Sequence, residues 1–149
     1  MVLRQLSMAP RSRHQLFGKL AERGVSEHVA VEILDRYEEV QLVDDAEFAK
    51  MWVRSRAQTS SLARSALKRE LAEKGITGEI AEDALAQRTD EDEMAAAEEL
   101  VRRKLRPLAD PGDRAGRDKQ VRRLVSMLAR KGYPPGAAFS IVKNVMADG

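Results

Sequence analysis

The chain has 149 residues, of which 34% are charged and only 4% aromatic, and it contains no cysteine. This composition favours helices and excludes a disulfide framework or a thiolate metal site. No run approaches the ~18 apolar residues that a membrane span requires, and the first residues lack the apolar core of a secretory signal. We therefore expect a soluble, cytoplasmic protein.

The first part of the chain predicts two helices behind a loose start. Residues 1–11 are expected to be a disordered lead-in. A first helix is predicted from the N-cap Ser12 to Arg23, and a second over about residues 27–40, with Ser26 as its N-cap.

A third helix is predicted to begin near Asp45, because Asp44 and Glu47 form a D-x-x-E capping box. It carries Phe48 and Trp52 one turn apart, and this spacing favours core packing over a base-stacking platform. The segment 58–61 is expected to end it.

The second half of the chain repeats this arrangement and then departs from it. Helices are predicted over about 62–74 and 78–86, and another begins near Asp90, which forms a second capping box with Glu93. Residues 107–116 contain two prolines and two glycines, and they are predicted to be a linker. The last two helices are predicted over about 117–131 and 135–146.

One pattern occurs three times: two leucines four residues apart, a basic residue, a glycine and then an apolar residue. It reads LFGKLAERGV from Leu16, LKRELAEKGI from Leu67 and LVSMLARKGY from Leu124. The leucines share one helix face, and Gly24, Gly75 and Gly132 are predicted to end each helix in the left-handed conformation. We therefore predict an all-α fold of tandem three-helix repeats in an elongated array. The predicted divisions are repeat 1 (12–59), repeat 2 (60–106), the linker and a two-helix, truncated repeat 3 (117–149).

Charge is unevenly distributed although the net charge is only +2. Residues 89–99 hold six carboxylates and no basic side chain, whereas residues 100–131 hold eleven basic and three acidic side chains. The excess of positive charge in residues 100–131 favours an anionic partner. The alternative is a solvated helix face whose charges complement the helix dipoles.

No motif for catalysis or cofactor binding is present. The sequence lacks a glycine-rich phosphate loop and an H-E-x-x-H motif, and its two histidines, His14 and His28, are too isolated to form a metal site. We therefore expect no enzyme activity, no cofactor, no metal and no small-molecule substrate.

The order of these motifs resembles the RecX family of regulators of the RecA recombinase. The resemblance rests on the helix that ends in L-x-x-x-L-x-x-[KR]-G-aliphatic, on the capped helix after it, and on the motif Leu42-Val43-Asp44-Asp45 with Phe48 and Ala49. It covers about residues 12–146. It implies a curved protein that binds in the groove of the RecA–DNA filament and inhibits ATP hydrolysis, strand exchange and co-protease function.

Basic residues at the repeat junctions and in the third repeat are the predicted contacts to RecA or DNA. As a class they are Arg54, Arg56, Arg64, Lys68, Arg69, Arg102, Arg103, Arg122 and Arg123. The sequence leaves two other hypotheses open: a helical protein that binds single- or double-stranded DNA directly through residues 100–131, and a helical scaffold for some other protein. We expect a monomer that does not bind membranes.

Overall fold

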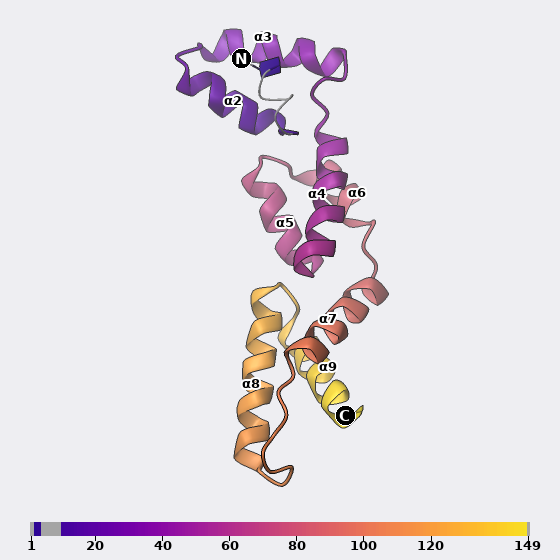
Figure 1. The fold of residues 1–149 in the computed structure, drawn as a ribbon. Coiled ribbons are helices and arrows are strands. Elements are labelled where there is room, and N and C mark those ends of the chain that lie inside the picture. Colours follow the sequence, from indigo (N-terminus) through magenta and orange to yellow (C-terminus); the bar gives the residue numbers. More distant parts are fainter. Residues whose placement is uncertain (1, 4–9, 149) are drawn as a thin grey trace. The chain divides into compact units, whose positions relative to one another are not determined.

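The computed structural model describes residues 2–3 and 10–148, and the regular structure in these residues is entirely helical. This confirms the predicted all-α fold. The helices are α2 (Arg13–Glu22), α3 (Glu27–Glu39), α4 (Asp45–Ser60), α5 (Arg64–Glu73), α6 (Gly78–Leu85), α7 (Asp90–Lys104), α8 (Arg114–Arg130) and α9 (Pro135–Asp148) (Figure 1).

The helices belong to two compact units that interleave along the chain. Unit 1 comprises Met1–Ser55 and Lys68–Gln87, and unit 2 comprises Arg56–Leu67 and Arg88–Gly149. Helices α4 and α5 therefore each contribute residues to both units. The predicted repeats are continuous stretches of chain, so they divide the molecule differently, and their boundaries stay a prediction.

The threefold leucine–glycine pattern is confirmed in its local geometry. Its six leucines are at most 4% exposed, and the three glycines have φ of +80°, +77° and +96°. In each copy the residue after the glycine donates its backbone N–H to the carbonyl of the second leucine. The pairs are Val25 to Leu20, Ile76 to Leu71 and Tyr133 to Leu128. This is the hydrogen bond of a Schellman cap, so each copy ends its helix in the same way.

Unit 1 has a core between α2 and α3, formed by Leu16, Leu20, Ala30 and Leu34. Val2 is helical and buried in the same core, so the predicted disordered lead-in is wrong at this residue; residues 1 and 4–9 of that stretch lie outside the described residues. The N-cap Ser12 is confirmed, because its hydroxyl accepts a hydrogen bond from the Gln15 backbone in a capping box.

Trp52 differs from its prediction as a core residue. The side chain is only half-buried, and its indole N–H donates to Glu70 at 2.9 Å. Lys74 places its ammonium 4.2 Å from the centre of the ring, and the ring stacks on Phe48 with centroids 6.0 Å apart. A tryptophan with one polar edge and one cationic neighbour is typical of a core boundary.

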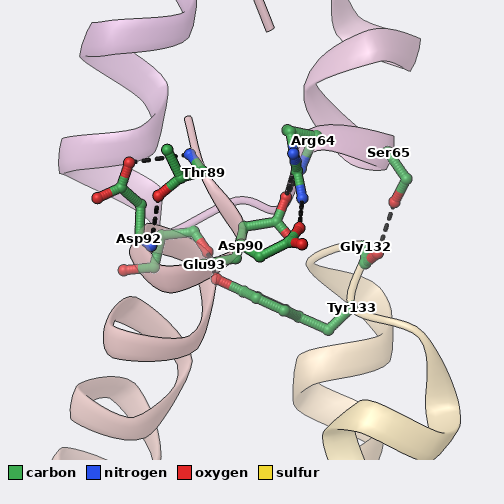
Figure 2. Close-up of polar contacts among 9 residues, drawn as sticks. Arg64, Ser65, Thr89, Asp90, Asp92, Glu93, Gly132 and Tyr133 are labelled. Atoms are coloured by element: carbon green, nitrogen blue, oxygen red, sulfur yellow. Dashed lines mark hydrogen bonds and ion pairs between the residues drawn. The ribbon is translucent and has the colours of Figure 1, made fainter. Parts of the chain in front are cut away.

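Unit 2 has a core in which α9 packs against α7 and α8. The turn between α8 and α9 contacts the segment that precedes α5 through backbone atoms. Ala63 donates its N–H to the Lys131 carbonyl at 2.9 Å, and the Tyr133 hydroxyl donates to the Ser61 carbonyl at 2.7 Å. The Ser65 hydroxyl also donates to the Gly132 carbonyl (Figure 2). We call this contact the α8–α9 clasp.

The predicted end of α4 is confirmed, whereas the predicted cap of α7 and the predicted start of α8 are wrong. Helix α4 ends at Ser60, within the segment 58–61 that was expected to end it. The N-cap of α7 is Thr89 instead of Asp90, and its capping box uses Asp92 (Figure 2). Helix α8 begins at Arg114, because Asp113 caps it by accepting a hydrogen bond from the Gly116 backbone. The observed linker is therefore shorter than the predicted segment 107–116.

Candidate nucleic-acid interface

Unit 2 contains an open groove of ≈ 780 Å³ that six basic side chains line: Arg103, Lys104, Arg106, Arg123, Arg130 and Lys131. Three hydroxyl residues (Thr59, Ser60 and Ser61) and three apolar ones (Leu62, Leu100 and Met127) complete its wall. Within the described part of the chain, no carboxylate lines it. We call it the basic groove, and its charge suits a polyanion.

Helical spacing explains why these cations share one surface. On α7, Leu100 lies three and four residues before Arg103 and Lys104, so all three are on one side of the helix. On α8, Arg123 and Arg130 lie seven residues apart, which is about two turns. The core leucines of α7 and α8 pack into a single cluster, and this packing fixes the two basic faces.

Helix termini offset part of the charge in the basic groove. Helices α4, α7 and α8 end at Ser60, Lys104 and Arg130, and all three residues line it. Arg123 donates to the Lys104 carbonyl at 2.9 Å, and Lys131 donates to the Ser60 carbonyl at 2.9 Å. These two cations therefore complement helix dipoles, as a purely stabilising role would require.

A comparison of the charges shows that complementing helix dipoles accounts for only part of the positive charge in the basic groove. Each helix C-terminus carries about half a negative elementary charge, so three termini supply roughly −1.5. Six cations face them, and most of the positive charge is left for an external anion.

Of the nine predicted contact residues, two line the basic groove: Arg103 and Arg123. In the same unit, Arg122 is exposed on α8, and Arg56 donates to the Ser60 hydroxyl at 2.8 Å. In unit 1, Arg69 is exposed on α5. The structure therefore brings only part of the predicted class together.

The other four predicted residues are paired with carboxylates in their own units. In unit 1, Arg54 lies 3.8 Å from Glu47 and Lys68 lies 2.9 Å from Glu82. In unit 2, Arg102 lies 3.7 Å from Asp148, and Arg64 contacts Glu93 and Asp90. An exposed ion pair reduces the charge that a side chain offers to a partner, although it contributes little stability by itself.

Arg64 is the most strongly bound of these four. Its Nε donates to Glu93 at 2.6 Å, and its Nη2 donates to Asp90 (Figure 2). These hydrogen bonds, with Glu93 first, raise the pKa of the Arg64 guanidinium. Arg64 therefore ties the start of α5 to the start of α7, and we assign it a structural role.

Four residues of the basic groove were not among the predicted contacts: Lys104, Arg106, Arg130 and Lys131. All lie within residues 100–131, whose excess of positive charge was evident from the sequence. Spacing along α7 and α8 could have placed Lys104 beside Arg103, and Arg130 on the face of Arg123. No described helix is long and apolar enough to span a membrane.

Comparison with known proteins identifies an all-helical regulatory family. Residues 1–36 match the model "RecX, first three-helix domain", and residues 44–85 match "RecX, second three-helix domain". The chain belongs to the RecX family.

Individual relatives agree with this assignment. The chain is 44% identical to the regulatory protein RecX of Mycolicibacterium vanbaalenii, over 98% of this chain and 80% of the relative. It is also 44% identical to the regulatory protein RecX of Streptomyces lividans, over 98% of this chain and 76% of the relative. The crystal structure of RecX from Lactobacillus salivarius has a TM-score of 0.80 at 24% identity, over 98% of this chain and 92% of that one. This last similarity concerns the fold.

Proposed function

We propose that this protein binds in the groove of the RecA–DNA filament and inhibits the recombinase, lowering ATP hydrolysis, strand exchange and co-protease function. Membership of the RecX family is the observation that carries the proposal. The proposed partner is the RecA filament, reached in the cytoplasm by a protein without enzyme activity of its own. Through this partner the protein would modulate DNA repair and the SOS response.

The basic groove supports contact with the DNA of such a filament. Its six cations face no lining carboxylate in the described residues, and phosphate oxygens are the acceptors that arginine and lysine bind most readily. Several weak contacts along a filament strengthen one another, because binding of one surface raises the effective concentration of the next.

The direct test is DNA-dependent ATP hydrolysis by the cognate RecA, measured with and without this protein at a substoichiometric ratio. Inhibition is the expected result, because each molecule bound in the groove of the filament affects many RecA protomers. An unchanged rate of hydrolysis, together with no detectable binding to the filament, would refute the proposal.

The basic groove also favours a second candidate, which is direct binding to nucleic acid without the recombinase. A direct binder would hold bare single-stranded DNA tightly, and its affinity would fall steeply with salt. A filament regulator would bind bare DNA weakly and the assembled filament much more tightly. Fluorescence anisotropy of labelled DNA, alone and within a filament, separates the two at several salt concentrations.

A further inference from the structure

A second hollow adjoins the basic groove in unit 2. It has a volume of ≈ 440 Å³ and shares Arg106 and Arg123 with the basic groove. Lys119 adds a further cation to this hollow, and Pro107, Leu108 and Gly116 are uncharged residues that line it. No carboxylate in the described residues lines this hollow either. The cationic surface therefore extends beyond the basic groove along α8.

Gln120 lines the adjoining hollow, is only 7% exposed, and contacts the two arginines that both hollows share. Its side-chain oxygen accepts the backbone N–H of Arg106 at 2.6 Å and an Nη2 hydrogen of Arg123 at 3.4 Å. The same nitrogen of Arg123 donates to the Lys104 carbonyl. A buried amide oxygen that is bonded in this way is costly to disturb, so Gln120 fixes the backbone of Arg106 and the guanidinium of Arg123.

The extent of the cationic surface indicates a chain of anions instead of a single one. Lys119, Arg123 and Arg130 lie along one stripe of α8, at intervals of four and seven residues. At 1.5 Å per residue the stripe spans ~16 Å. A nucleic-acid strand places a phosphate about every 3.4 Å of its helix axis, so the stripe faces several phosphates.

The chemistry of the lining indicates recognition of phosphate without recognition of bases. Base-binding sites for single strands stack bases on aromatic side chains, but neither hollow has an aromatic side chain among its described lining residues. The apolar parts are aliphatic, namely Leu62, Leu100, Met127 and Leu108. Such a lining offers charge and van der Waals contact but no aromatic stacking surface.

We propose that the basic groove and the adjoining hollow form one site for a linear chain of phosphates, and that Gln120 is its positioning residue. The ligand is recognised through its phosphates alone, so a nucleic-acid strand and inorganic polyphosphate share the required chemistry. The inference deepens the DNA contact in the proposed function and rests on it for its biological setting. It makes no use of the recombinase.

The test is a competition experiment with the full chain and a labelled single-stranded oligonucleotide. The competitors are an unlabelled strand of the same length, an abasic strand, long-chain inorganic polyphosphate and pyrophosphate. We expect the abasic strand to compete within a few-fold of the normal strand, and pyrophosphate to compete at least tenfold more weakly. Competition by polyphosphate shows that it too is a source of the ligand. If only strands with bases compete, the proposal is overturned.

Three variants locate the site. Lys119→Gln removes a cation that lines only the adjoining hollow and should weaken binding of long chains several-fold, with a shallower salt slope. Arg114→Gln is the matched control, because Arg114 is an exposed base on the same helix and lines neither hollow. Equal effects of these two variants would overturn the extension along α8.

Gln120→Met keeps the volume of the side chain but removes the oxygen that accepts from both arginines. Loss of one well-placed charged contact corresponds to about tenfold in affinity. We expect this loss with a salt slope close to that of the unaltered chain, because no charge is removed. A lower melting temperature with unchanged affinity would show that Gln120 has only a structural role. If this variant fails to fold, Lys119→Gln and Arg114→Gln still decide the proposal.

Failure of this inference is distinguishable from failure of the proposed function. Recombinase inhibition without phosphate-chain binding leaves the regulator proposal intact and removes the site. Phosphate-chain binding without recombinase inhibition supports the site and contradicts the regulator proposal.

Discussion

The Gly132→Ala substitution tests the α8–α9 clasp most directly. A Cβ at this position would lie 2.7 Å from the Ser65 hydroxyl oxygen and 2.8 Å from both the Cβ and the backbone nitrogen of Ala66. The hydroxyl can rotate away, but the backbone of α5 cannot move without shifting its helix. Gly132 also has φ of +96°, which alanine adopts only with strain.

The expected cost is the sum of these two effects. The left-handed conformation costs an alanine roughly 1–2 kcal/mol, and overpacking typically costs a further ~1–3 kcal/mol. We therefore expect Gly132→Ala to lower the free energy of unfolding by roughly 2–5 kcal/mol. Urea unfolding followed by circular dichroism measures this value.

Two other glycines provide matched controls. Gly24 has φ of +80° but nothing within 4 Å of its added Cβ, so Gly24→Ala should show the conformational cost alone. Gly136 is a helical glycine in α9 with the same open space and no positive φ, so Gly136→Ala should be neutral or stabilising. If Gly132→Ala costs no more than Gly24→Ala, the close approach in the clasp does not constrain this position and our reasoning is refuted.

Four further predictions concern other contacts. Thr89→Ala should cost about 1 kcal/mol, because it removes the N-cap of α7; no change in urea unfolding would contradict the cap. The hydrogen bond from the Thr89 backbone lowers the pKa of Asp92, so Asp92 stabilises the fold above the ordinary aspartate pKa, and this contribution is lost as pH falls through the lowered value. Asp92→Asn should flatten the acid limb of a stability–pH curve. An unaltered limb would show that Asp92 does not cause the loss of stability at acidic pH. Ser12→Ala should cost about 1–3 kcal/mol, because Ser12 is fully buried, caps α2 and donates to the Lys74 carbonyl at 2.8 Å; thermal melting measures it, and an unshifted melt would contradict the assignment. Trp52 should be quenched by acrylamide to an intermediate degree, since it is half-buried; complete protection would restore the core prediction.

The left-handed residues were predictable where they are glycines, but not after α3 and α4. Glycine at a left-handed position is a clear signal, and all three such glycines of the repeat pattern occupy that conformation. After α4 the same conformation is adopted by Ser61, with φ of +55°, and after α3 by Gln41, with φ of +61°. Serine and glutamine rarely adopt the left-handed conformation, so these two positions carry no such signal in the sequence.

The charge of the basic groove was predictable, but the choice of residues was not. Eleven basic side chains in residues 100–131 indicated an anionic partner. Which of the predicted bases are available depends on the carboxylates that folding brings to them. Arg64 meets Glu93 across 29 positions of sequence, and Arg102 meets Asp148 near the other end of unit 2. Helical periodicity describes neighbours within one helix, so it could not identify these partners.

The interleaving of the two units has a consequence for how the chain folds during synthesis. Unit 1 is not complete until Gln87 has left the ribosome, yet residues 56–67 have emerged by then and belong to unit 2. Ala63 is buried in the core of α7–α9, so the nascent chain exposes this segment until the rest of unit 2 is made. A fragment cut after Gln87 would keep that segment uncovered, and one that begins at Arg88 would lack it. We therefore expect each of these two fragments to be less stable than the same residues are in the whole chain.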